Sequence, residues 1–132
     1  MRTFWEKVSI LHQEANRSES KKMPDRYSRH YYDVYKLGQS YVKTKALENF
    51  SLLQIVLNFK EKFYRTPWAK FEEAVPGSIR LLPPDYRIKE LANDYESMQD
   101  MLFGDKPQFH DLLEILQVLE KEINSISSTN IV

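Results

Sequence analysis

The stretch RYSRHYYDVYKLG at residues 26–38 combines four tyrosines, three Arg or Lys residues and a single acid, Asp33. On a helix, Arg29 and Asp33 stand four residues apart and therefore share one face. Tyrosines at this density favour a packed face, and the charged residues favour a second face that meets a charged group. The segment FWEKVSILHQE lies just upstream, at residues 4–14. We interpret the two segments together as the functional clue in this chain.

The sequence lacks the residues that several common catalytic and metal-binding sites require. His12, His30 and His110 are far apart, none belongs to an H-x-x-x-H arrangement, and there are no cysteines, so we predict no metal site from these side chains. The sequence also has no G-x-S-x-G elbow, no P-loop, no dinucleotide fingerprint and no D-x-D pair. We expect the three histidines to be surface or capping residues.

Charge is unevenly distributed along the chain, although the formal net charge is zero. Residues 1–70 hold 14 Lys and Arg against 7 Asp and Glu, whereas residues 71–132 hold 5 against 12. A basic half can attract the phosphates of a nucleotide or of RNA. The alternative is that the two halves simply complement each other in the folded chain.

Length and composition favour one all-α domain. A chain of 132 residues is long enough to bury a core, and it has only three glycines and few alternating, strand-like runs. The absence of cysteines fits a reducing, cytoplasmic location, and no apolar run approaches the roughly 18–20 residues of a membrane span. We predict a single helical bundle over residues 1–126 and a frayed tail over 127–132.

Capping signals set the expected boundaries of the first two helices. Thr3 and Glu6 form a T-x-x-E capping box, in which Thr3 would be the N-cap of the first helix. A polar loop follows over residues 16–24. Asp25 is placed to cap the tyrosine-rich helix, which should end near Gly38.

A further helix is predicted over residues 51–64, after a short segment near 41–48. Ser51 and Gln54 resemble a second capping box, and Phe50 and Ile55 are spaced as a hydrophobic staple. Because its apolar residues nearly encircle its first turns, we predict that this helix is the central, buried one.

The rest of the chain predicts a long Pro-rich crossing loop and two amphipathic helices, which brings the expected total to five or six helices. The loop covers residues 65–87, with a helical turn near 68–73. Apolar residues then recur at steps of three and four in two stripes. They are Ile88, Leu91, Tyr95, Met98 and Leu102, before Gly104, and Leu112, Ile115, Leu116, Leu119, Ile123 and Ile126.

The segments FWEKVSILHQE and PDRYSRHYYDVYKL resemble the C-terminal half of the AbiEii/AbiGii-type toxin nucleotidyltransferases of type IV toxin–antitoxin systems. The stretch NFKEKFYRTPWAKFEEAVPGSIRLLPPDYRIKELANDYESM resembles the tail of the same family, so the resemblance covers nearly the whole chain. In such enzymes an N-terminal half carries a G-S motif and a D-x-D pair, and the helical C-terminal half adds a lysine and an aspartate. The resemblance places these last two on Lys7 and Asp33, and the N-terminal half has no counterpart in this sequence.

The resemblance implies transfer of a nucleotidyl group from an NTP, with Mg²⁺, onto RNA such as tRNA or onto protein. Lys7 would contact phosphates and Asp33 would organise the site, both as catalytic residues. Glu6, Arg29, Lys60 and Arg65, with Lys62, are weaker candidates for nucleotide or RNA contacts. The alternative for Glu6, Lys7, Arg29 and Asp33 is a set of surface ion pairs, each worth about 0–1 kcal/mol. The alternative for Lys60, Lys62 and Arg65 is that they are ordinary surface side chains whose charged ends extend into solvent.

We expect the isolated chain to be inactive, because the metal-binding acids are missing from it. Its expected partners are an NTP, RNA, an N-terminal catalytic domain or a cognate antitoxin, without a membrane. The alternative function is that of a non-enzymatic helical module that binds a nucleotide, RNA or a partner protein.

Overall fold

The computed structural model describes residues 2–63, 66–102, 104 and 106–130, with side chains up to residue 125. This part of the chain contains α-helices and short 3-10 turns but no strands, which confirms the all-α prediction. The α-helices are α1 (Arg2–Ala15), α2 (Ser28–Gly38), α3 (Tyr41–Leu47), α4 (Phe50–Phe63), α5 (Asp85–Ser97) and α6 (Phe109–Asn130). The 3-10 turns are η1 (Pro67–Ala69), η2 (Phe71–Glu73) and η3 (Gln99–Met101).

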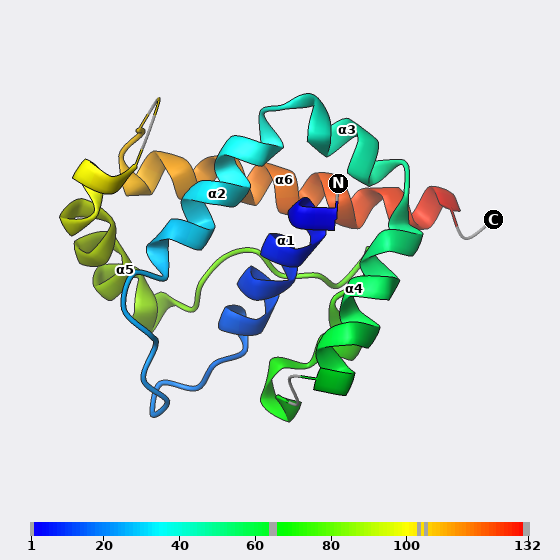
Figure 1. Ribbon diagram of the computed structural model, residues 1–132, viewed down its shortest axis with the longest axis horizontal. Helices are drawn as coiled ribbons and strands as arrows, with labels where there is room; N and C mark the ends of the chain where they lie inside the picture. The colour runs from blue at the N-terminus through cyan, green and yellow to red at the C-terminus, as the bar shows by residue number, and fades with distance from the viewer. Residues whose placement is uncertain (1, 64–65, 103, 105, 131–132) are drawn as a thin grey trace.

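Helix α1 is the centre of the bundle. It packs against α2 on one side and α4 on the other, while α6 crosses the molecule and packs against α2 and α5 (Figure 1). Four large α1 side chains have no exposed surface because neighbouring helices cover both flanks of α1. They are Phe4, Trp5, Val8 and Leu11.

The prediction that the 51–64 helix is central is wrong. In α4, Leu53, Val56 and Leu57 are buried, but the opposite face is open. Ile55, Phe59 and Phe63 are 50%, 44% and 60% exposed, respectively. The helix therefore buries a single stripe, because α1 and the short α3 cover only one side of it.

The predicted capping boxes are also wrong, because Thr3 and Ser51 lie within their helices instead of capping them. Helix α1 includes Arg2, and Glu6 pairs with the Arg2 side chain instead of reaching back to Thr3. Helix α4 includes Phe50, and the Ser51 hydroxyl bonds the Asn49 side chain.

The predicted staple fails as well. Phe50 packs on the Trp5 ring at 5.4 Å, while Ile55 faces outward.

The cap of α2 comes from a distant part of the chain. Asp25 is exposed, and no side chain of the N-cap residue Tyr27 bonds the helix end. Instead, the Asp94 carboxylate of α5 accepts hydrogen bonds from the backbone N–H groups of Arg26 (2.9 Å) and Ser28 (3.1 Å). It also accepts one from the Ser28 hydroxyl. Thus α5 anchors the start of α2, and the prediction for Asp25 is wrong.

The described part of the predicted crossing loop ends where α5 begins at Asp85, and it contacts α1 on one side and α6 on the other. Beyond η2 its side chains Ile79 and Leu81 are buried. On the α1 side, His12 Nε2 donates to the Lys70 carbonyl (2.9 Å), and His12 Nδ1 accepts from the Arg80 N–H (3.1 Å). On the α6 side, Asn124 Oδ1 accepts from the Gly77 and Ile79 N–H groups.

This arrangement makes His12 a core residue and not the surface or capping residue that we expected. It has no exposed surface, and burial lowers its pKa below the ordinary value. Its two ring nitrogens satisfy two backbone groups of the crossing loop, which would otherwise be buried without partners.

The two predicted apolar stripes are largely buried. On α6, Leu112, Leu116 and Ile123 have no exposed surface, whereas Ile115 is 39% and Val118 67% exposed.

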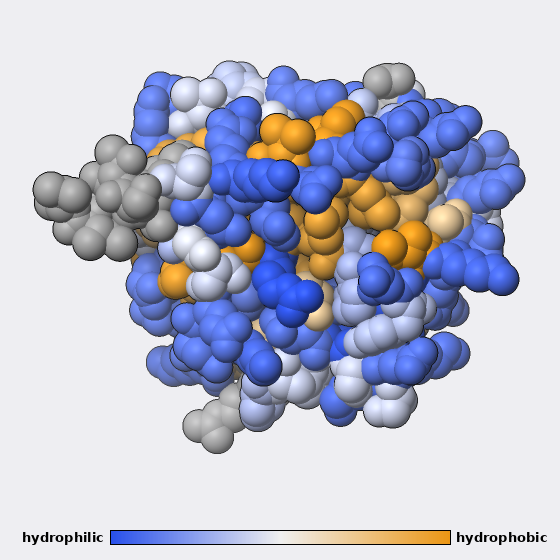
Figure 2. Space-filling view, turned by 180° about the vertical axis from the view of Figure 1, so that it is seen from behind, coloured by the Kyte–Doolittle hydropathy of each residue, from blue (hydrophilic) through white to orange (hydrophobic). Residues whose placement is uncertain are grey.

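Seen from the side opposite to Figure 1, apolar side chains reach the surface in the middle of the molecule, surrounded by polar ones (Figure 2). The side chain of Ile126 lies outside the described residues, and the boundary between domain and tail at residue 126 stays a prediction.

Candidate functional site

The packing of α1 against α2 brings Lys7 and Asp33 together. Lys7 Nζ lies 3.1 Å from Asp33 Oδ2, and the two side chains are 26% and 28% exposed. On α2, Tyr31 and Val34 are fully buried, which leaves Asp33 on the partly exposed side of the helix. The pair is therefore an ion pair at the seam between two helices that are separated by the loop over residues 16–27.

His30 completes the contacts of the Lys7 ammonium. His30 Nδ1 lies 3.2 Å from Lys7 Nζ, and the Tyr27 ring packs edge-on against the imidazole at 4.7 Å. Burial, and after it the charge of Lys7, lowers the pKa of His30 to about 4. The ring is therefore neutral at physiological pH. The sequence suggested no role for His30 beyond a surface histidine. Its spacing of three residues from Asp33 is the signal that could have identified it.

Lys60 adds a second ammonium group from α4. Its Nζ donates to the Glu6 carbonyl at 3.3 Å and lies 5.8 Å from the centre of the Phe71 ring. Burial is the main reason that its pKa falls to about 8. The charge of Glu6 raises this pKa, and the charge of Lys7 lowers it. We refer to Lys7, His30, Asp33 and Lys60, which come from three helices, as the Lys7 cluster.

The other predicted site residues lie at its edge or outside it. Arg29 is exposed, and its charge contributes to the lowered pKa of His30. The Glu6 carboxylate pairs with Arg2 at 3.0 Å and its charge raises the pKa of Lys60, while the Glu6 backbone carbonyl accepts the hydrogen bond from Lys60. Lys62 is exposed and lies over the Phe63 ring. Arg65 lies outside the described residues.

The Lys7 cluster is suited to anions. It combines two ammonium groups with one carboxylate, and the guanidinium of Arg29 adds positive charge nearby. The Lys7 and Asp33 side chains of the cluster are partly exposed at the surface. A hollow of about 510 Å³ lies elsewhere, around Tyr95 and Phe109.

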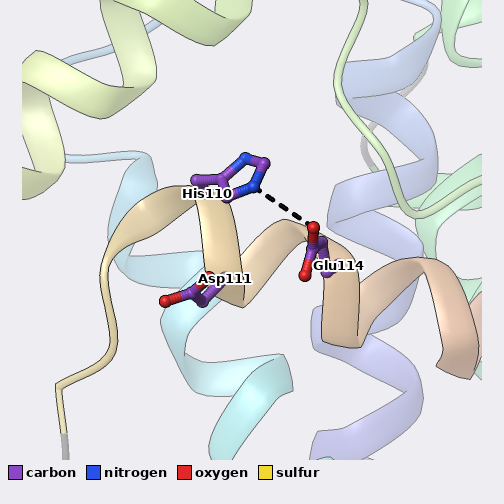
Figure 3. Close-up of side chains that lie close together, drawn as sticks. All are labelled: His110, Asp111 and Glu114. Carbon is purple, nitrogen blue, oxygen red and sulfur yellow. Dashed lines mark ion pairs between the residues drawn. The ribbon is translucent and has the colours of Figure 1, made fainter.

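Among the described residues, one group of three possible metal ligands lies close together, at the start of α6 (Figure 3). It consists of His110, Asp111 and Glu114, all exposed, with ligand atoms within 4.8 Å of one another. His110 points toward Glu114, and its Nε2 lies 3.2 Å from Glu114 Oε1. A His–Glu pair four residues apart is an ordinary helix-surface pair, and the positive end of the α6 dipole disfavours a cation there. We assign no metal to this group.

Comparison with known proteins identifies the family. The family model described as "Nucleotidyl transferase AbiEii toxin, Type IV TA system" matches residues 1–118, which include every member of the Lys7 cluster. No curated protein and no solved structure gave a significant match. None of the described helices is long and apolar enough to cross a membrane. The match confirms the resemblance found in the sequence: the chain belongs to the AbiEii family of nucleotidyltransferase toxins of type IV toxin–antitoxin systems.

Proposed function

We propose that this chain supplies the helical, phosphate-binding part of a nucleotidyltransferase site, with the Lys7 cluster as its ligand-binding surface. The reaction would transfer a nucleotidyl group from an NTP to RNA or protein. Lys7 contacts the phosphates, and Asp33 orients Lys7 or accepts a hydrogen bond from a substrate hydroxyl. The family follows from the matched family model, and the ligand, the acceptor and these residue roles are our proposal.

The observation that carries the proposal is the convergence of two ammonium groups from α1 and α4 beside a single carboxylate. Lys60 Nζ donates to a backbone carbonyl, and its charge is disfavoured by burial and by Lys7 and favoured by the Glu6 carboxylate. Like charges held near one another are costly in the free protein, and a polyanion removes that cost on binding. A triphosphate therefore gains more from this cluster than from isolated surface lysines.

The cluster fits the phosphates of an NTP but does not fit the Mg²⁺ that the family implies. Magnesium needs several oxygen ligands in octahedral geometry. Asp33 is the one carboxylate that bonds a member of the cluster among the described contacts, and its Oδ2 is occupied by Lys7. Metal-binding acids would have to come from outside the cluster. We therefore propose that the 132-residue chain alone does not transfer nucleotides.

Binding of inorganic triphosphate and of each NTP, measured by isothermal titration calorimetry, tests the binding half of the proposal. We expect Lys7→Ala and Lys60→Ala each to weaken binding about tenfold, as the loss of one charge-assisted contact implies. Lys89→Ala, an exposed lysine of α5, is the matched control and should bind as the wild type does. If Lys7→Ala binds triphosphate as tightly as the wild type, the site is elsewhere.

Incubation with labelled NTPs, Mg²⁺ and total tRNA tests the catalytic half. We expect no label transfer by the isolated chain, and robust transfer would show that it carries a complete site. When the chain works with a catalytic half, Lys7→Ala and Asp33→Ala should each abolish transfer and leave the helical circular dichroism spectrum unchanged. If both variants transfer at the wild-type rate, the chain is better described as the non-enzymatic binding module.

Membership of a toxin–antitoxin family also implies a protein partner, the antitoxin. We propose that RNA is the acceptor, because the basic residues are concentrated in the half of the chain that contains the Lys7 cluster. Competition of tRNA with triphosphate for the chain, at low and high salt, tests this part of the proposal. If tRNA binds the chain without competing with triphosphate, RNA binds elsewhere.

A further inference from the structure

Lys7 is held by two acceptors of different charge. A lysine ammonium has three N–H donors and no acceptor. One donor meets the anionic Asp33 Oδ2 at 3.1 Å, and a second meets the imidazole Nδ1 of His30 at 3.2 Å. These two contacts come from one helix and leave the third N–H of Lys7 for a ligand.

The contact with Lys7 determines the state of the His30 ring. Because the ammonium can only donate, His30 Nδ1 must carry the lone pair, and the proton of the neutral ring is on Nε2. The charged groups that act on the ring are Lys7 from α1, Arg29 and Asp33 from α2, and Lys60 from α4. Three of these four are cations, so a protonated ring, which would also turn Nδ1 into a donor, is disfavoured.

The fold holds the ring in place. The Tyr27 ring packs edge-on against the imidazole, with an angle of 82° between the two planes. The His30 N–H donates to the Tyr27 carbonyl at 3.0 Å, in the first turn of α2. That turn is anchored by the Asp94 carboxylate of α5 through Arg26 and Ser28. A continuous set of contacts therefore runs from α5 to the Lys7 ammonium.

We propose that His30 is a positioning residue that fixes the Lys7 ammonium through a neutral acceptor, so that Lys7 is ordered before a phosphate arrives and the cluster keeps its positive charge. A second carboxylate in this place would order Lys7 equally well but would remove the net charge that attracts the anion. Without an acceptor, the long lysine side chain must be ordered at the moment of binding. This inference rests on the proposed function for the role of the phosphate, but the link between His30 and Lys7 does not depend on it.

Three substitutions at one position separate charge from hydrogen bonding. The side-chain oxygen of His30→Asn can replace Nδ1, His30→Leu has no acceptor, and His30→Asp supplies a charged acceptor. We expect His30→Asn to bind inorganic triphosphate within about threefold of the wild type. We expect His30→Leu and His30→Asp each to bind about tenfold more weakly. His110→Asn, at an exposed histidine of α6, is the matched control and should change nothing.

The proposal is overturned if His30→Leu binds triphosphate as the wild type does, or if His30→Asp binds as well as His30→Asn. Circular dichroism of each variant shows that the helical fold is retained. If His30 had only a structural role, the triphosphate affinity of each variant would follow its stability. His30→Asn and His30→Asp would then weaken triphosphate binding equally.

Nitrogen NMR of the histidine rings tests the link between His30 and Lys7 without any ligand. We expect the Nε2–H tautomer in the wild type. We also expect a higher pKa for His30 in Lys7→Met, because that variant removes the largest charge effect on the ring. An Nδ1–H tautomer, or a tautomer and pKa that Lys7→Met leaves unchanged, would overturn the inference even if triphosphate binds. Conversely, a wild type that binds no triphosphate would refute the proposed function and leave the NMR result to decide the role of His30.

Discussion

The anchoring of α2 by Asp94 offers the sharpest test of how this fold is held together, and the perturbation is Asp94→Ala. The carboxylate accepts hydrogen bonds from two N–H groups at the start of α2 and from the buried Ser28 hydroxyl. Loss of a helix cap costs about 1 kcal/mol, and a buried hydroxyl without its acceptor costs about 1–3 kcal/mol. The sulfur of Met98 lies 3.4 Å from the Ser28 hydroxyl and is a weak substitute, so the lower part of that range applies. We expect a total loss of about 2–3 kcal/mol.

Urea denaturation followed by circular dichroism at 222 nm measures this loss. We expect a lower urea midpoint with an unchanged slope, and a fall in Tm of about 6–12 °C for a chain of this size. Most single domains have a free energy of unfolding of about 5–15 kcal/mol, so Asp94→Ala should remain folded at 25 °C. Glu96→Ala, at an exposed position of the same helix, is the control and should change stability by less than about 0.5 kcal/mol.

A double-mutant cycle with Ser28→Ala isolates the buried hydroxyl. In the double variant no hydroxyl is left without an acceptor. The double variant should therefore lose about 1 kcal/mol less unfolding free energy than the two single variants lose together. Fully additive effects would show that the Ser28 hydroxyl does not depend on Asp94. A cost of Asp94→Ala below about 0.5 kcal/mol would show that Asp94 does not anchor α2.

Further predictions concern acid, the crossing loop and α4. Since the folded-state pKa values of His12 and His30 lie below that of an unfolded histidine, about 6.5, the unfolded chain binds more protons. The urea midpoint should therefore fall as the pH drops from about 6.5 toward about 4, and a flat profile would refute this. His12→Leu should cost about 2–4 kcal/mol, because two crossing-loop backbone groups lose their partners; a cost below about 1 kcal/mol would mean that water replaces the ring. On α4, Leu53→Ala should cost about 2–5 kcal/mol and Phe59→Ser less than about 1 kcal/mol, and equal costs would restore the buried-helix prediction.

The sequence was sufficient for the fold class and the family. Periodic apolar residues are a local signal, and they predicted helices where the described chain has α1, α2, α4, α5 and α6. The order of charged and aromatic residues in the first two segments was specific enough to indicate the family that the family model confirms. It also directed attention to Lys7 and Asp33, whose ion pair is now observed and whose catalytic role stays a prediction.

The tertiary structure decided which helix is central and how the site is completed. Counting apolar residues cannot tell whether one or both sides of a helix are covered, so the apolar α4 turned out to be peripheral and the more polar α1 central. Likewise, Asp94 caps α2 across 66 and 68 residues of sequence, and Lys60 approaches Lys7 from a third helix. Each of these contacts depends on how the helices pack and on which polar groups lose their contact with water when they are buried. Those are properties of the assembled chain, and local sequence patterns do not contain them.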